Sequence, residues 1–223
     1  MLKVVIVVFT FHFFVILSVL ENLNGMEQRK EEIQDIHSKI NTDTVFIFDM
    51  DGTLVDTNFA NFLSYKKAIL SVTKSDCNLT YNPDNRFYRN NLKKAVPNLS
   101  ESEYERIIQE KEEYYKDFLP ETKLNKTLAD ILFKYSKTNR TILVTNCRQD
   151  RASETLEYHG LTDKFSKLFF RQFSSNNEKI NKFQNAIQSL GVSPDAVIAF
   201  ENEKTEIEDA IEAGIIAYNI VKL

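Results

Sequence analysis

The chain has 223 residues, of which 43% are hydrophobic and 27% are charged, and its formal net charge is −4. This length suits one good-sized domain, or a core domain with a smaller insertion. The acidic balance lacks the basic excess that is typical of nucleic-acid-binding proteins. Two cysteines, Cys77 and Cys147, do not make a disulfide framework, so we expect free thiols.

Residues 1–25 differ in composition from the rest of the chain. Lys3 precedes an almost uncharged apolar run that ends at Leu20. This order predicts either a signal peptide or an uncleaved signal anchor in the membrane, and therefore a protein of the secretory pathway, secreted or membrane-anchored. If translation starts at Met26 instead, the protein is expected to be cytoplasmic. Residues 26–43 are predicted to form a polar helical lead-in, since three isoleucines recur at helical spacing.

An apolar run over residues 44–48 ends abruptly in two carboxylates, Asp49 and Asp51, followed by Gly52. A short β-rich run closed by glycine predicts a buried strand that ends at a turn. In an open parallel sheet, ligands bind outside the carboxyl ends of the strands, where these acids are expected. Two carboxylates this close are unfavourable unless a cation or a shared proton compensates them. Phosphoryl transfer uses such a pair, with one Asp attacking phosphorus and the other moving a proton.

Residues 58–119 show a helical pattern, and helices then alternate with short apolar strands to the end of the chain. This order predicts a doubly wound, Rossmann-like α/β core over residues 44–57 and 120–223, with an inserted α-helical cap over 58–119. The expected helices of the insertion begin near residue 59, at 86 and after a capping box at Ser100–Glu103. In the core, strands are expected over 141–145, 167–170, 196–200 and 215–218, and helices over 128–135, 148–159, 178–190 and 205–213.

The stretch Asp49-Met-Asp-Gly-Thr-Leu-Val-Asp-Thr57 resembles the first motif of the haloacid dehalogenase-like hydrolases, in the branch of phosphoglycolate phosphatase and β-phosphoglucomutase. The resemblance implies Mg²⁺-dependent hydrolysis of a small phosphate monoester through an aspartyl-phosphate. It makes Asp49 the nucleophile and Asp51 the general acid and base, with the carboxylate of Asp49 and the backbone carbonyl of Asp51 touching Mg²⁺. It also implies a small α-helical cap in the place of the insertion.

Thr145 and Asn146 follow a predicted strand and precede a helix, like the second motif of that family. A hydroxyl and backbone N–H groups at a helix start can hold a phosphate oxygen. The family also places a lysine at the start of the next helix. Lys179 and Lys182 both compete for that role, and we expect Lys179, in the first turn of the predicted helix, to bind phosphate and support catalysis.

The last motif runs from Phe200 to Gly214 and resembles the acidic motif of the family. Asn202 stands where relatives usually have a metal-binding Asp, and its amide oxygen carries no charge. Mg²⁺ prefers hard oxygen ligands, so we expect Asn202 to be supported by Glu201 or Glu206.

Two alternatives to a phosphatase remain open at this point. One is a phosphomutase of the same family, and the other is a catalytically weak relative that binds a phosphorylated ligand. In each case the expected partner is a small phosphorylated metabolite and not a nucleic acid. The oligomeric state is open.

Overall fold

A computed structural model describes residues 40–173, 175–176 and 179–222. Its central element is a five-stranded sheet in the order β5-β4-β1-β6-β7, with every neighbouring pair parallel. The strands are β1 (Val45–Phe48), β4 (Arg140–Val144), β5 (Lys167–Phe169), β6 (Val197–Glu201) and β7 (Ile220–Lys222). The predicted doubly wound parallel fold is therefore confirmed.

Strand β1 lies in the middle of the sheet because both of its faces are apolar. All four of its residues are buried, as expected for a strand that is covered from both sides. Phe48, its last residue, lies opposite Leu143 of β4 and Phe200 of β6. The chain segments that follow these three strands therefore meet at one edge of the sheet.

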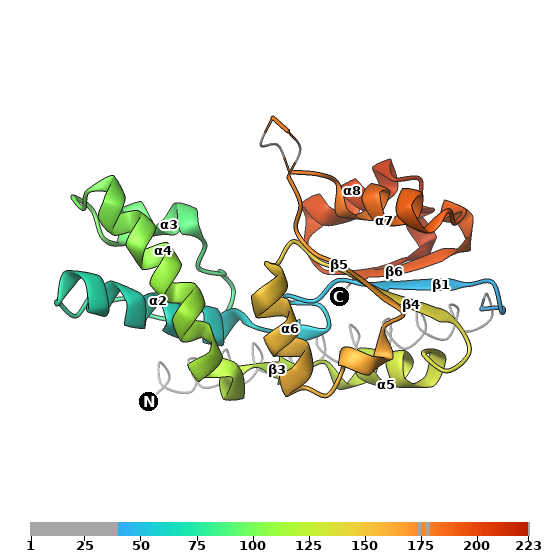
Figure 1. Cartoon of the computed structure of the whole chain (residues 1–223), viewed down its shortest axis with the longest axis horizontal. Coiled ribbons are helices and arrows are strands. Elements are labelled where there is room, and N and C mark those ends of the chain that lie inside the picture. Colours follow the sequence, from blue (N-terminus) through green and yellow to red (C-terminus); the bar gives the residue numbers. More distant parts are fainter. Residues whose placement is uncertain (1–39, 174, 177–178, 223) are drawn as a thin grey trace, which may run out of the picture. The chain divides into compact units, whose positions relative to one another are not determined.

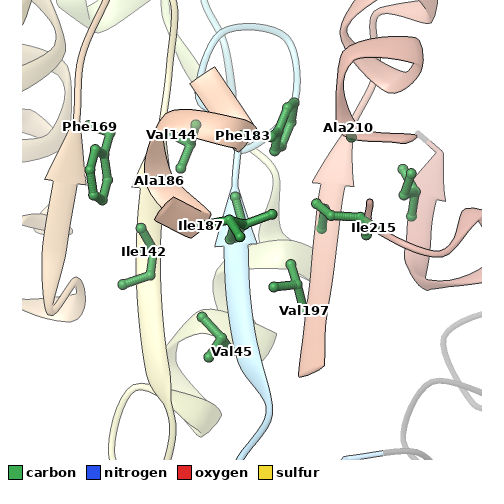
Figure 2. Packing of buried hydrophobic residues seen from close by; sticks show 13 residues of the cluster. Val45, Ile142, Val144, Phe169, Phe183, Ala186, Ile187, Val197, Ala210 and Ile215 are labelled. Atoms are coloured by element: carbon green, nitrogen blue, oxygen red, sulfur yellow. The ribbon is translucent and has the colours of Figure 1, made fainter. Parts of the chain in front are cut away.

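Helices cover both faces of this sheet (Figure 1). Helices α7 (Lys182–Leu190) and α8 (Lys204–Glu212) pack on one face, where Phe183 and Ile187 of α7 join the main hydrophobic cluster with residues of the strands (Figure 2). On the other face, the ring of Phe46 stacks on Tyr135 of α5 (Lys126–Tyr135). Helix α6 (Gln149–Tyr158) lies beside α5 in this layer.

The stretch between β1 and β4 is largely helical. It contains α2 (Asn58–Thr73), α3 (Arg89–Ala95), α4 (Glu101–Tyr115) and the 3₁₀ helix η1 (Lys116–Glu121), and Figure 1 shows α2, α3 and α4 as a group of their own. These helices have a separate hydrophobic cluster that includes Tyr65, Leu92 and Ile107. The strands β2 (Val55–Asp56) and β3 (Lys123–Leu124) enclose the group as an antiparallel pair. We refer to residues 57–122 as the helical insertion.

The last strand and one helix of the insertion do not begin where they were expected. The last strand was expected over residues 215–218, but residues 217–219 form the 3₁₀ helix η4 (Ala217–Asn219) and β7 begins only at Ile220. A helix was expected from Arg86, but α3 begins at Arg89 because the backbone N–H of Tyr88 donates to the side chain of Asn91 and closes a capping box there. Arg86 is left in an extended segment, which matters for the site. Two further 3₁₀ turns, η2 (Thr162–Lys164) and η3 (Pro194–Ala196), join elements of the core.

The expectations for the N-terminal part of the chain, at residues 1–25 and over most of 26–43, lie outside the described residues. Among the residues that are described, no helix has both the length and the apolar composition that crossing a membrane requires.

Candidate active site

Three strand ends bring the expected site residues together. Asp49 and Asp51 follow β1, Thr145 and Asn146 follow β4, and β6 ends at Glu201. These residues line one cavity of about 460 Å³, together with Glu206, several arginines and residues of the helical insertion. The structure therefore brings the two carboxylates, the threonine motif and the acidic motif into one pocket.

Lys182 is the cation that binds Asp49. Its ammonium group lies 2.7 Å from Asp49 Oδ1, 2.8 Å from Glu201 Oε2 and 3.4 Å from Glu206 Oε2. The side chain is almost completely buried. Burial alone would lower the pKa of Lys182, but the carboxylates of Asp49, Glu201 and Glu206 outweigh it and raise the pKa above its usual value. Lys182 therefore stays charged at any physiological pH.

The expectation that Lys179 occupies this position is wrong. Asn181 caps α7, because its side-chain oxygen accepts from the backbone N–H groups of Phe183 and Gln184, so the helix begins at Lys182 and not near 178. Lys179 lies before the helix, 42% exposed, and binds Glu206 Oε1 at 2.5 Å and Asp209 Oδ2 at 3.6 Å. The asparagine was a readable helix-start signal, and it would have favoured Lys182.

One lysine does not balance the acids around it. Glu201 is fully buried, and its burial together with the charge of Asp49 raises its pKa to about 7. Burial also raises the pKa of Asp49, in spite of the ion pair with Lys182. When all are ionised, Lys182 and Lys179 carry one positive charge fewer than Asp49, Glu201 and Glu206, so a further cation or a proton beside these three carboxylates is favoured.

Asp51 is held by two arginines, and the sequence analysis predicted neither contact. Arg86 Nη2 lies 3.2 Å from Asp51 Oδ1, and Arg151 Nη2 lies 2.9 Å from Oδ2. The hydroxyl of Thr57 also donates to Oδ1, at 2.5 Å. Burial would raise the pKa of Asp51, but Arg151 and Arg86 outweigh it and hold the pKa well below its usual value. In this arrangement Asp51 is an anion.

The two arginines come from different parts of the chain. Arg86 belongs to the extended segment before α3, in the helical insertion, whereas Arg151 lies in the first turn of α6. Arg151 also donates from Nε to the sulfur of Cys147 at 2.8 Å. Burial raises the pKa of the Cys147 thiol to about 12, so it is a neutral, free thiol. No local motif marks either arginine, and only the fold shows that both reach Asp51.

Thr145 and Asn146 lie at the cavity but already have partners. The hydroxyl oxygen of Thr145 accepts from the backbone N–H of Cys147 at 3.1 Å, and thereby shapes the turn before α6. The side-chain amide of Asn146 donates to Glu206 Oε2 at 2.7 Å. Both residues are in the predicted place, next to Asp49 and Lys182 in the lining of the cavity.

Asn202 lies against the turn that carries the two aspartates. Its side-chain oxygen accepts from the hydroxyl of Thr53 at 2.9 Å. Gly52 has a positive φ of 86°, and a Cβ at this position would lie only 2.8 Å from Asn202 Nδ2. The Thr53 side chain also works against the rise of the Asp49 pKa. Thr53 is therefore in contact with Asn202 and acts on Asp49, and only glycine fits at position 52 beside Asn202.

The donor set for a metal ion is rich in oxygen but is already occupied by protein contacts. Among the described residues, no three His, Cys, Asp or Glu side chains are grouped so that they could hold a metal ion. Glu201 Oε1 accepts from the backbone N–H groups of Asn202 and Glu203, and its Oε2 binds Lys182. Glu206 binds both lysines and Asn146. Asp49 and Asn202 supply the hard oxygen atoms that would hold a divalent cation, although the amide oxygen of Asn202 already accepts from Thr53.

Comparisons with known proteins agree with this geometry. The sequence profile described as haloacid dehalogenase-like hydrolase matches residues 46–220. The chain belongs to this family. It is similar to the curated "Phosphorylated carbohydrates phosphatase" of Thermotoga maritima, with 28% identity over 180 residues that cover 76% of this chain and 81% of the relative. The resemblance that the sequence motif carried is confirmed, and the chain is a phosphatase-type enzyme of that family.

Solved structures show the same fold. A Thermotoga maritima protein assigned as a β-phosphoglucomutase is 25% identical, with a TM-score of 0.57 over 79% of this chain and 83% of its own. CbbY from Rhodobacter sphaeroides, solved in complex with phosphate, is 17% identical, with a TM-score of 0.61 over 77% and 83% of the two chains. At 17% identity the second structure shows the fold alone.

Proposed function

We propose that this haloacid dehalogenase-like hydrolase cleaves a small phosphate monoester through an aspartyl-phosphate on Asp49, with Mg²⁺ as cofactor. The observation that carries the proposal is the buried contact of Lys182 with Asp49 at the carboxyl end of β1. An anionic nucleophile attacking an anionic phosphate needs a fixed positive charge beside it. The names of the curated relative and of the 25% identical structure support phosphoryl-transfer chemistry.

In the first half of this reaction, a carboxylate oxygen of Asp49 bonds to phosphorus while the bond from phosphorus to the ester oxygen breaks. Asp51 supplies the proton that the departing oxygen needs. To donate it, Asp51 first has to leave Arg86 and Arg151 and take up a proton from solvent, because it is ionised while they hold it. Lys182 offsets the charge on Asp49 and on the phosphoryl oxygens throughout.

In the second half, water attacks the phosphorus and the bond to Asp49 breaks, which releases phosphate. Asp51 takes a proton from that water, a step that suits its ionised state. Mg²⁺, held by Asp49, by Asn202 and by the backbone carbonyl of Asp51, would neutralise charge on the phosphoryl oxygens. Thr145 and the N–H groups at the start of α6 are proposed to receive a phosphoryl oxygen.

The test is phosphate release from a panel of small phosphate esters, with and without Mg²⁺. We expect metal-dependent turnover that Asp49→Asn abolishes. Lys182→Met is expected to lower kcat/KM by at least about a hundredfold, since an electrostatic contact of this kind contributes a few kcal/mol to the transition state. Lys179→Met is the matched control and should stay within about threefold of the wild type. Equal losses in the two lysine variants would contradict the assignment of Lys182.

Asn202 favours a second candidate, a catalytically weak relative that binds a phosphorylated ligand. The neutral amide oxygen gives Mg²⁺ less electrostatic attraction than an aspartate would. If the site is limited in this way, Asn202→Asp should increase the apparent affinity for Mg²⁺ at least about tenfold and raise turnover at low Mg²⁺. Titration of activity with Mg²⁺ measures both quantities. An unchanged titration curve would mean that the native ligands suffice.

A phosphomutase remains the alternative within the same chemistry. It would return the phosphoryl group to the substrate, so it would convert one phosphate ester into an isomer and release little phosphate. Product analysis by ³¹P NMR in the assay above separates the two activities.

For the N-terminal segment we propose entry into the secretory pathway, on the basis of Lys3 and the apolar run that follows it. Sequencing the N-terminus of the mature protein tests this proposal. An intact N-terminus in a cytoplasmic fraction would contradict it.

A further inference from the structure

Lys111 and Glu112 are neighbours on α4, in the helical insertion. Both line the cavity and have no role in the proposed chemistry. Lys111 is only 2% exposed, which is unusual for a lysine that is not part of the catalytic contacts. Its ammonium group lies 3.3 Å from Glu112 Oε1.

The pair lies one aromatic ring away from the arginine that holds Asp51. The ammonium of Lys111 is 5.8 Å from the centre of the Tyr115 ring, and the guanidinium carbon of Arg151 is 5.2 Å from the same centre. Arg151 in turn binds Asp51. Lys111 and Glu112 therefore lie beyond Asp51 in the same cavity, in reach of the part of a substrate that leaves when its phosphate is transferred.

The hydrogen-bonding capacity of the pair is not used within the described part of the chain. Glu112 Oε2 is buried, and no described residue donates to it. Lys111 has three N–H donors, and the only hydrogen bond found for them among the described residues is the long one to Glu112 Oε1. Buried polar atoms of folded proteins nearly always have partners, so an unmet acceptor beside unmet donors at a cavity wall points to a ligand.

The chemistry of the pair selects among ligands. A hydroxyl group can donate to Glu112 Oε2 and accept from Lys111 at the same time, and Tyr65 adds another hydroxyl to the same lining. A carboxylate or a second phosphate has no proton to donate and would face the negative charge of Glu112. Apolar groups would leave both charged atoms without partners.

We propose that Lys111 and Glu112 bind hydroxyl groups of the leaving alcohol, so that the preferred substrate is the phosphate ester of a sugar or polyol and not of a hydroxy acid. This inference rests on the proposed function, and it adds the two residues that determine the specificity. It also explains why a helix of the insertion carries a buried lysine beside a half-buried glutamate.

The experiment compares two six-carbon esters, glucitol 6-phosphate with its hydroxyl groups and hexyl phosphate without them. The measured quantity is the ratio of kcat/KM for the first ester to that for the second. For Glu112→Gln we expect this ratio to fall about tenfold to a hundredfold, because a hydrogen bond to a charged group is replaced by a weaker one. Lys111→Met should lower the same ratio. Glu113→Gln removes an exposed carboxylate from the same helix and should leave the ratio within about twofold of the wild type.

A ratio that Glu112→Gln and Lys111→Met leave unchanged would overturn the proposal, even if both variants are less active, since a purely structural role affects the two esters equally. Preference of the wild type for 6-phosphooxyhexanoate, which ends in a carboxylate, would overturn it as well. If the protein releases phosphate from none of these esters, the proposed function fails. Calorimetric binding of glucitol 6-phosphate and hexyl phosphate to the wild type and to Glu112→Gln then decides the subsite separately.

Discussion

Lys111 and Lys182 are both buried, and they show how the surroundings of a lysine determine its protonation state. Lys182 has three carboxylates around it, and they raise its pKa above the usual value in spite of burial. Lys111 has one carboxylate beside it, and burial together with the charge of Arg151 lowers its pKa to about 8. The first lysine is therefore a fixed positive charge, whereas the second loses its proton slightly above physiological pH.

The lowered pKa of Lys111 predicts a pH dependence of stability. A folded-state pKa of about 8, against the ordinary value of 10.5, means that the unfolded chain binds more protons between these two pH values. The free energy of unfolding contributed by this group therefore rises as pH increases from about 8 to 10.5, by at most about 3 kcal/mol. Below pH 8 the charged lysine is protonated in both states and its full burial penalty remains.

Urea unfolding over this pH range measures the free energy of unfolding of the wild type and of Lys111→Met. The effect is the difference between the two pH curves, because the methionine variant has no ionisable group at this position. The exposed Lys116 supplies the control, since Lys116→Met should follow the wild-type curve. Parallel curves for the wild type and Lys111→Met would refute the assignment.

At the scale of single elements, the start of α7 places the lysine of the site. Asn181 accepts two backbone N–H bonds of the first turn and donates to the backbone oxygen of Asp209 at the end of α8. Lys182, the first residue of the helix, therefore reaches Asp49 from a fixed backbone position. On the other side of this contact, the turn at Gly52 positions the backbone that carries Asp49.

Removal of this cap should loosen the contact. Asn181→Ala is expected to lower the free energy of unfolding by about 0.5–2 kcal/mol, and to reduce phosphate release because Lys182 loses its fixed backbone. Asn181→Ser keeps a capping oxygen and should retain most of the stability. Chemical denaturation and the phosphate assay report the two effects. An alanine variant as stable and as active as the serine variant would contradict this role of the cap.

Much of the element pattern could be predicted from local sequence, and the site only in part. The buried strand before Asp49, the capping box at Ser100 and the glycine after α7 are local signals, and each marks a true boundary. The lysine was misplaced because the helix was expected to begin at 178, which put Lys179 in its first turn, whereas it begins at Lys182. Arg86 and Arg151 could not be predicted, because they are far from Asp51 in the sequence. Arg86 meets Asp51 through the packing of the insertion on the core, and Arg151 meets it through the packing of α6 within the core.

At the scale of the whole described chain, two of the hydrophobic clusters are separate from each other. One lies between the sheet and α7 and α8, and the other lies within the helical insertion. Polar contacts connect the insertion to the site, among them Arg86 with Asp51 and the hydroxyl of Tyr88 with Glu203 Oε1 at 3.0 Å. Contacts of this kind are weaker than the packing within either cluster, so the two parts are expected to open separately.

Hydrogen exchange can detect this separation. Ile107→Ala creates a cavity in the cluster of the insertion and should destabilise it by about 2–5 kcal/mol. We expect amide exchange to become faster in α2, α3 and α4, with little change in β1 and β6. Ile142→Ala makes the same truncation in the sheet and should accelerate exchange in the strands. Uniform acceleration in both variants would show that the chain opens as one unit.

The antiparallel pair of β2 and β3 has a consequence for how the helical insertion of such an enzyme can be replaced by another. Asp56 pairs with Lys123, so the two ends of the helical insertion leave the core side by side. A stretch whose ends already touch can be exchanged for another of different length while the catalytic strands keep their order. The residues proposed to bind the leaving alcohol lie inside that stretch, and those proposed for phosphoryl transfer are, apart from Arg86, outside it. Transplanting residues 57–122 into a relative should therefore transfer the preference for a particular leaving alcohol. The phosphoryl-transfer reaction of the relative should stay the same.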